Sequence, residues 1–363
     1  MRAAAAARPL VGGPSLGRSA LVLGLGTVVL AGAALVGLGF GSVDLGLSEA
    51  IGIIAQRLGL SVTESWPATA PTILFEVRLP RVLAGMVVGA GLGCAGVVFQ
   101  ALLRNPMADP YVIGTAAGAS LGAVVALTAP IVIPALAIGA GSAWLGIGLV
   151  QVLAFAGGLG AVGLVLAVAR PAGRSNMFTL LLTGYAVSAL LAAGVALLLV
   201  SSGRAMAAVV GWLFGSLAGA GYAELALAGP LVVGGSVLLL LRWRTLNLLL
   251  LGDDAAAALG VDLEPARRAL VALATVVTSA AVAVAGTIGF VGLVVPHLVR
   301  LALGPDHRLL LPVSCLGGAT LLVVADAAAR VAGGIPVGVV TALLGAPFFL
   351  WLLRRANASP VSP

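Results

Sequence analysis

Long apolar runs, interrupted by short clusters of arginine, proline and glycine, dominate the pattern of residues along the chain. A helix needs about 20 mostly apolar residues to cross the hydrocarbon core of a bilayer. We expect ten of these runs to form membrane-spanning helices, and the third and the eighth are short for a full crossing. The predicted spans are 19–41, 82–103, 112–128, 145–168, 178–200, 225–241, 269–289, 291–303, 309–328 and 337–353.

The longest polar interruption covers residues 42–80, between the first two predicted spans. Five apolar residues within it recur at roughly helical spacing, which predicts an amphipathic helix lying on the outer surface. They are Leu45, Leu47, Ile51, Ile54 and Leu58. The first apolar run exceeds the roughly 7–15 residues of a secretory signal core, so we expect it to be retained as a span.

Composition supports the same fold class. Of the 363 residues, 61% are hydrophobic and only 9% are charged, whereas a soluble domain has about 25% charged residues. So little polar surface cannot coat a globule in water. We therefore predict an all-α polytopic membrane protein with one membrane domain at 19–355. Residues 1–18 and 356–363 are then tails, 42–80 an external loop and 242–268 a cytoplasmic loop.

All 19 basic residues are arginine. A Walker A loop uses a lysine to reach nucleotide phosphates, so we expect no ATPase of that type in this chain. With the N-terminus inside, fourteen arginines lie on the cytoplasmic side of the predicted spans and five lie outside. The positive-inside rule demands this asymmetry, which places both termini in the cytoplasm and explains the net charge of +7 without nucleic-acid binding.

Glycines four residues apart recur in three segments. Small residues at i and i+4 clear one face of a helix, so that a neighbouring backbone can approach closely within a membrane. We expect all three segments to pack in this way. They are Gly85, Gly89 and Gly93; Gly114, Gly118 and Gly122; and Gly211, Gly215 and Gly219.

The cytoplasmic loop contains the string LGDDAAAALGVDLEPARR. Asp253 is placed to cap a short helix with Gly260 as its left-handed end, and Asp262 to cap a second short helix. Two short capped helices would form a compact surface for a partner to grip. The alternative is a plain connecting loop.

Three arginines lie near the predicted outer face: Arg78 and Arg81 in the string RLPR, and Arg330 in ADAAAR. An exposed guanidinium binds a carboxylate through two parallel hydrogen bonds, so these residues could receive acidic groups of a partner. The alternative is positional, because arginines often end spans and Arg330 could pair with Asp326 one helical turn before it.

The string QALLRNPMADP joins the second and third spans on the predicted inner face. Its prolines, Asn105 and Asp109 predict a rigid turn, which either borders a transport path or simply connects two helices. His297 and His307 have no cysteine or carboxylate neighbours at metal-ligand spacing, so we expect no metal site. Cys94 and Cys315 lie in apolar runs, where packing is the expected role.

Four strings together resemble the FecCD type of ABC importer permease, over roughly residues 20–355. They are RLPRVLAGMVVGAGLGCAGVVFQALLRNPMADPYVIGTAAGASLGA, AVAGTIGFVGLVVPHLVRLALGPDHRLLLP, GGATLLVVADAAAR and PVGVVTALLGAPFFLWLL. The resemblance implies the type II ABC importer permease architecture, with ten spans, in a bacterial cytoplasmic membrane. It also implies a second permease subunit, two ATPase subunits that carry ATP and Mg²⁺, and a substrate-binding protein. The chain itself would be no enzyme and would bind no cofactor.

The resemblance also implies roles for particular residues. Arg78, Arg81 and Arg330 would dock the binding protein, and the ATPase would grip a coupling helix bounded by Asp253, Asp254, Leu259 and Gly260. Asn105, Met107 and Met177 would border the cytoplasmic gate, although this chain reads NMF around Met177 where some members have small hydroxyl residues.

The expected function is ATP-driven import of a metal chelate by alternating access. An iron–siderophore complex is the expected substrate, with haem or cobalamin as alternatives. A secondary transporter would need ionisable relays near the membrane centre, and only Asp326 comes close. An intramembrane enzyme would need a clustered nucleophile and base, which two isolated histidines do not supply.

Overall fold

The computed structural model describes residues 16–41, 45–132, 143–169 and 177–358, and within these ranges the chain is almost entirely helical, with no strand. A helix corresponds to each of the ten predicted spans, although α5 begins three residues after the predicted start of its span and α13 ends four residues before the predicted end of its span. Seven of the described helices are long and apolar enough to cross a membrane, and the other apolar helices are shorter. The ten are α1 (Leu16–Gly39), α4 (Leu79–Leu102), α5 (Thr115–Val132), α7 (Ala143–Val168), α8 (Met177–Val200), α10 (Tyr222–Leu240), α13 (Leu263–Ala285), α14 (Val291–Leu303), α15 (His307–Val331) and α16 (Val337–Ala358).

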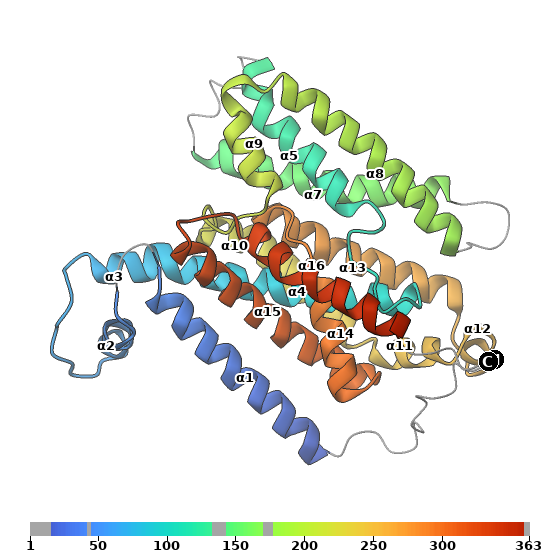
Figure 1. The fold of residues 1–363 in the computed structure, drawn as a ribbon, viewed down its shortest axis with the longest axis horizontal. Coiled ribbons are helices and arrows are strands. Elements are labelled where there is room, and N and C mark those ends of the chain that lie inside the picture. Colours follow the sequence, from blue (N-terminus) through green and yellow to red (C-terminus); the bar gives the residue numbers. More distant parts are fainter. Residues whose placement is uncertain (1–15, 42–44, 133–142, 170–176, 359–363) are drawn as a thin grey trace.

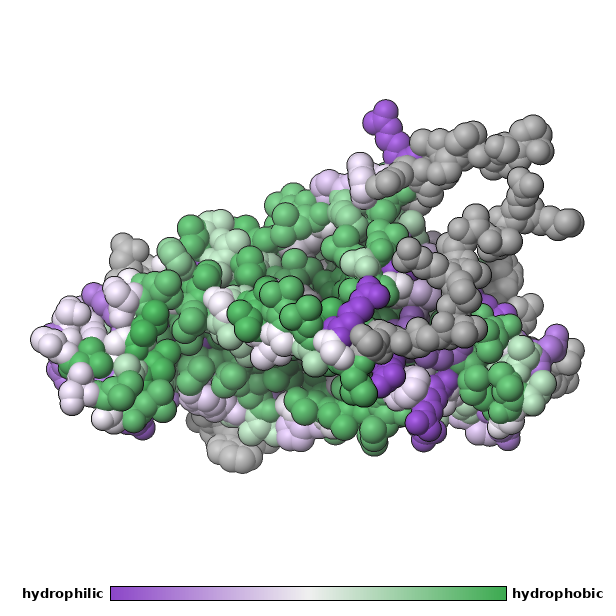
Figure 2. All heavy atoms as spheres, turned by 90° about the horizontal axis from the view of Figure 1, so that it is seen from below, coloured by the Kyte–Doolittle hydropathy of each residue, from purple (hydrophilic) through white to green (hydrophobic). Residues whose placement is uncertain are grey.

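Helix α4 is the centre of the bundle and packs against α15, α13, α10 and α14. On one side of this group lie α5, α7, α8 and the short helix α9 (Met206–Leu213), and on the other side α1 lies along α15 (Figure 1). Hydrophobic residues cover most of the middle of the face drawn in Figure 2. An apolar belt of this kind is what a bilayer requires of the surface that it surrounds.

Short helices occupy opposite ends of the bundle (Figure 1). One end, the α2 end, carries α2 (Leu47–Arg57), α3 (Ala70–Thr72) and the π-helical segment η1 (Ile73–Arg78). The other, the α12 end, carries α11 (Trp243–Leu250) and α12 (Asp253–Ala258). Of the candidate functional residues, Arg78, Arg81 and Arg330 lie at the α2 end, and Asp253, Asp254, Leu259 and Gly260 lie at the α12 end.

Close backbone contacts confirm the prediction at two glycines in each of the first two segments, whereas Gly85 meets mainly side chains and Gly114 lies before α5 with a φ of 93°. A Cβ built on Gly89 would lie 2.3 Å from the carbonyl oxygen of Gly318, and one on Gly93 would lie 2.3 Å from that of Ser314, so α4 and α15 touch backbone to backbone. Helices α5 and α7 meet in the same way, since a Cβ on Gly118 would lie 2.2 Å from the Gly157 oxygen.

The third predicted segment is wrong. Helix α9 ends at Leu213, so Gly215 and Gly219 lie beyond it. A Cβ on Gly211 or Gly219 would meet no atom within 4 Å, and Gly215 has a φ of 70° in a turn. The spacing of four therefore repeats here without a helix to carry it.

The connection between α13 and α14 is irregular backbone inside the bundle. Helix α14 has 13 residues and spans about 20 Å, too little to cross the membrane alone. The polar groups of this break find partners on distant segments. Tyr111 donates its hydroxyl to the Ile288 carbonyl at 3.0 Å, and the Ser216 N–H donates to the Ala285 carbonyl at 2.8 Å. Such pairing is what makes non-helical backbone tolerable away from water.

The segment 42–80 differs from the prediction in two ways. The predicted surface helix exists as α2, but its buried face is formed by Ala50 and Ile53, while Ile51 and Leu58 of the predicted apolar stripe are exposed. Residues 70–78 are not a loop, because α3 and η1 continue directly into α4.

Candidate functional site

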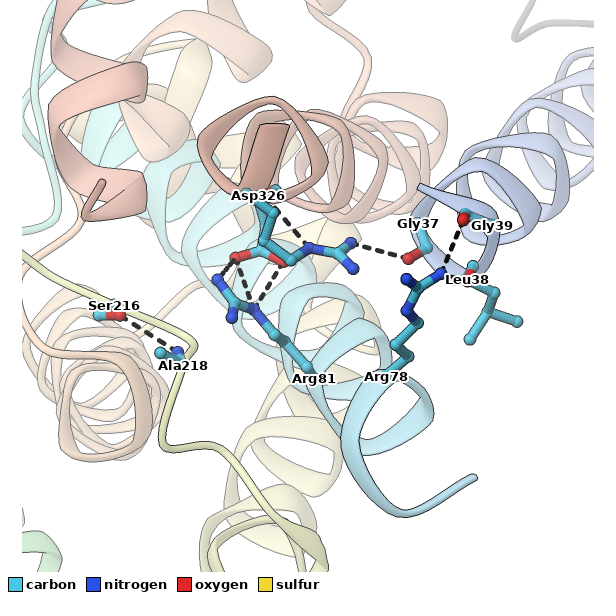
Figure 3. Close-up of polar contacts among 9 residues, drawn as sticks. Gly37, Leu38, Gly39, Arg78, Arg81, Ser216, Ala218 and Asp326 are labelled. Carbon is cyan, nitrogen blue, oxygen red and sulfur yellow. Dashed lines mark hydrogen bonds and ion pairs between the residues drawn. The ribbon is translucent and has the colours of Figure 1, made fainter. Parts of the chain in front are cut away.

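At the α2 end, Arg81 and Arg330 pair with Asp326, and Arg78 lies nearby at the end of α1 (Figure 3). The Arg81 guanidinium donates through Nε and Nη2 to both carboxylate oxygens of Asp326, at 2.8–3.0 Å. Arg330, one helical turn beyond Asp326, adds an ion pair through Nε at 3.1 Å. The Asp326 side chain is only 2% exposed, so the shared carboxylate is enclosed by its partners.

Arg78 and Arg330 also hold the end of α1. Nη1 of Arg78 donates to the carbonyl oxygens of Leu38 and Gly39, both at 2.6 Å, and Nη2 of Arg330 donates to that of Gly37 at 2.7 Å (Figure 3). These carbonyls are the unpaired acceptors that every helix leaves at its C-terminus. The arginines therefore fasten α1 to η1 and α15.

The expectation of exposed arginines is wrong for this chain. Arg78 is 4% exposed and Arg330 is 8% exposed. The alternative pairing of Arg330 with Asp326 is confirmed. The sequence hid this burial because the contacts join positions far apart, such as Arg81 and Asp326.

One buried donor of the cluster lacks a partner among the described residues, and its residue, Arg330, lines a pocket. Nη1 of Arg330 has no hydrogen-bond partner within the described part of the chain. Beside Arg330 lies a pocket of about 700 Å³ between the end of α1, the start of α2 and the end of α15. Two guanidinium groups, those of Arg81 and Arg330, share the one carboxylate, and Arg78 adds a third positive charge nearby, so the excess charge of the cluster is positive. A negatively charged group is the partner that this chemistry favours.

At the α12 end, Asp253 is the first residue of a six-residue helix. Its carboxylate pairs with Arg267 at 2.6 Å and with Arg104 from the end of α4. The hydrogen bond from Arg267 holds the pKa of the Asp253 carboxyl below its ordinary value. The predicted capping role is wrong, because the N-cap is Gly252 and no side chain caps the helix.

The other end of α12 matches the prediction for Gly260. This residue has a φ of 87°, and its N–H donates to the Ala257 carbonyl at 2.9 Å, while the Val261 N–H donates to the Ala256 carbonyl at 3.0 Å. The pair of bonds forms a Schellman motif. Asp254 and Leu259 are exposed. The α12 helix thus presents a charged start and an apolar finish to its surroundings.

The second short helix predicted after Asp262 does not exist as a separate element. Asp262 is the N-cap of α13, without a side-chain hydrogen bond, and α13 runs unbroken to Ala285. The segment that follows α12 therefore leads directly into the bundle.

The turn at 103–109 lies beside α12 through Arg104. Asn105 is exposed, and its side-chain oxygen accepts the N–H of Met107 at 2.9 Å, while Asp109 accepts the N–H of Tyr111 at 2.8 Å. Both are turns closed by the side chain's own backbone. Met177 begins α8, and its side chain lies outside the described part of the structure. The proposed gate residues thus belong to separate elements.

Sequence reasoning missed Arg104 and Arg267 as partners of Asp253. A further polar group ties α11 to α15, since Asn247 donates to Asp306 at 2.7 Å and accepts the His307 N–H at 2.9 Å. No local pattern marks these contacts, because their members are distant along the chain. The described residues contain no group of three histidine, cysteine or acidic side chains able to hold a metal ion.

The two ends together define a polytopic membrane protein whose polar groups lie at the α2 and α12 ends of an apolar bundle. A family model described as the FecCD transport family matches residues 28–355. The chain belongs to this family of transport permeases. It is a multi-pass protein of the inner membrane and the permease component of an ABC system, in which a separate subunit carries the ATPase.

Similar proteins agree with this assignment. The Halobacterium salinarum cobalamin import system permease protein BtuC is 50% identical over 289 residues, covering 79% of this chain and 75% of the relative. The Yersinia pestis hemin transport system permease protein HmuU is 42% identical over 287 residues, covering 78% and 83%. A solved structure described as an inward-facing metal-chelate type ABC transporter matches with a TM-score of 0.75 and 31% identity, covering 93% of this chain and 99% of that one.

Proposed function

We propose that this chain is a permease subunit that imports a metal chelate from the α2 end to the α12 end, by alternating access, as one of two permease subunits. The observation that carries the proposal is the placement of an arginine cluster and of the short helix α12, which ends in a Schellman motif, at opposite ends of one helical bundle (Figure 1). The sequence contains no lysine, so it has no Walker A loop for binding ATP. ATP binding to a partner must therefore favour one of two packings of the permease.

The α12 helix is the proposed ATPase contact. It is short, ends in a Schellman motif and exposes Asp254 and Leu259, while Asp253 is held from behind by two arginines. A rigid projection of this kind can transmit a push, because its own shape does not absorb it. Two ATPase subunits would each grip one such helix of the permease pair.

The arginine cluster is the proposed contact for a substrate-binding protein. Arg330 offers its unpaired Nη1 beside a pocket that opens among α1, α2 and α15. Acidic residues of the binding protein would complete the hydrogen bonds of the cluster and offset its positive charge. Because Arg78 and Arg330 also hold the end of α1, docking would act on that helix directly.

Asn105, Met107 and Met177 are the proposed residues of the cytoplasmic gate. The first two lie on the turn after α4, and Met177 begins α8. The turn is fixed by side-chain hydrogen bonds and lies next to the proposed ATPase contact. It is therefore placed to move when α12 moves. The orientation with both termini in the cytoplasm follows from the arginine distribution.

The substrate proposal keeps an iron–siderophore complex, haem and cobalamin as classes. Two relatives are named for cobalamin and for hemin, and the one named for cobalamin shares 50% identity, so cobalamin is the first compound to test. A secondary transporter finds little support, because Asp326, the acidic residue inside the predicted spans, is already paired with two arginines.

The test is uptake by proteoliposomes that contain the permease with its ATPase, offered labelled cyanocobalamin, haemin or a ferric siderophore together with the matching binding protein. ATP-dependent accumulation of one chelate supports the proposal. Combined replacement of Asp253, Asp254 and Leu259 by alanine should leave ATP hydrolysis uncoupled from uptake, whereas Arg268→Ala, at an exposed ion pair on α13, should transport normally. Uphill transport by the purified chain alone would refute the scheme.

A further inference from the structure

Helix α4 ends in an unusual way. Its last turn is closed by the Arg104 N–H, which donates to the Ala101 carbonyl at 3.2 Å, and by the Asn105 N–H, which donates to the Gln100 carbonyl at 3.1 Å. This is the Schellman pattern, in which the first residue beyond the helix adopts the left-handed conformation. Here that residue is Arg104, with a φ of 48°. Glycine is the usual occupant, because a side chain is disfavoured in this region.

The arginine side chain has a contact that a glycine could not make. Its guanidinium pairs with the carboxylate of Asp253, the first residue of α12, although 149 positions separate the two in the sequence. Both side chains are about half exposed, so the pair lies at the surface of the α12 end. The left-handed backbone at position 104 favours glycine, yet the residue there is arginine. The arginine side chain contributes an ion pair with α12 that glycine could not form.

The two arginines on Asp253 do different things. Arg267 lies on α13, which follows α12 in the chain, so this contact holds neighbouring segments together. Arg104 belongs to the turn 103–109 between α4 and α5, where it directly precedes Asn105. Through Arg104 the start of α12 is tied to the segment that contains the proposed gate residues.

We propose that Arg104 is the positioning residue that transmits displacement of α12 to the turn 103–109, through its ion pair with Asp253. The inference rests on the proposed function and deepens it by naming the connection between the ATPase contact and the gate. When α12 moves, Asp253 carries the Arg104 side chain with it. Arg104 occupies the left-handed position that ends α4. A displacement of its side chain therefore acts on the backbone that sets the direction of the turn 103–109.

The test uses the permease in nanodiscs with its ATPase bound, and measures amide hydrogen exchange in residues 103–114 with and without ATP and vanadate. We expect nucleotide to change the exchange rate of this turn in the parent protein by about fivefold or more. Arg104→Gly should abolish that change. Glycine suits the left-handed backbone, so this variant keeps the turn and removes only the side chain.

Three companions separate transmission from folding. Arg104→Lys keeps a positive charge within reach of Asp253 and should restore most of the nucleotide response. Asp253→Asn should reduce the response, and adding Arg104→Gly to it should cause no further loss, because both changes remove the Arg104–Asp253 ion pair and Asp253→Asn removes the pair with Arg267 in addition. Arg268→Ala, which removes an exposed ion pair with Glu264, should respond as the parent does.

The outcomes distinguish this inference from the function on which it rests. If the parent turn does not respond to the nucleotide-loaded ATPase, the proposed function fails and this inference fails with it. If the parent responds and Arg104→Gly responds equally, the inference alone is overturned. A response lost in Arg104→Gly and restored in Arg104→Lys supports it.

Discussion

Replacement of Gly96 by alanine tests whether backbone contact between helices holds the bundle together. Gly96 lies on α4 opposite Gly292 of α14, and a Cβ at this position would lie 1.9 Å from the Gly292 carbonyl oxygen. The obstructing atoms are backbone, so no side chain can rotate away. Alanine can enter only if α4 and α14 separate.

The size of the effect follows from the required separation. Carbon–oxygen contacts below 3.0 Å are essentially never observed, so the helices must part by about 1.1 Å at this crossing. A gap of that size forfeits roughly half of the dispersion attraction between the facing atoms. We therefore expect Gly96→Ala to lower the free energy of unfolding by about 1–3 kcal/mol, the usual cost of overpacking.

The matched control is Gly234→Ala on α10. A Cβ on Gly234 would meet nothing within 4 Å, so alanine there should leave stability unchanged or raise it by up to about 1 kcal/mol through better helix propensity. The assay is the fraction of folded protein that survives heating in detergent, followed by size-exclusion chromatography. Equal midpoints for the two variants would refute the argument from backbone contact.

Three further predictions concern the two ends. Asp326→Asn removes the carboxylate that offsets buried guanidinium groups, so unfolding free energy should fall by about 3–5 kcal/mol in the same heating assay; a stability equal to the parent would contradict the buried cluster. Gly260→Ala forces alanine into a left-handed φ and should destabilise the end of α12 by about 1 kcal/mol, seen as faster amide hydrogen exchange there than in the parent protein; an unchanged exchange rate would contradict the prediction. Because the pKa of Asp253 is lowered on folding by Arg267, its stabilising contribution is present above the unfolded pKa of about 3.9 and is lost as pH falls through the lowered value. Asp253→Asn should therefore reduce protection of α12 at neutral pH, and the difference from the parent should shrink as the pH falls below about 3.9.

The apolar runs predicted the ten helices well because the length of a membrane crossing is set by the bilayer rather than by tertiary context. The glycine spacing worked where a helix carried it, as at Gly89 and Gly118, and failed at Gly219, where the chain leaves α9. Residues 70–78 were predicted as loop because Glu76 and Arg78 interrupt the apolar pattern, yet the helix continues through them.

The sequence predicted where the candidate sites lie along the chain, but not which side chains are buried there or which of them pair. The position of α12 and the left-handed Gly260 follow from local turn chemistry. The burial of Arg78 and the pairing of Asp253 with Arg104 depend on segments brought together only by the fold. An arginine in a position suited to glycine carries no local signature, because the sequence does not show which residue ends α4.

The backbone contact between α4 and α15 has a mechanical consequence. Since Gly89 and Gly93 meet Gly318 and Ser314 without a side-chain layer between them, the two helices have little freedom to slide or roll against each other. The two helices form one rigid unit, and the ion pair between Arg81 and Asp326 joins them at the α2 end. We therefore expect α4 and α15 to move together, so that a tilt of one end of the pair also displaces its other end.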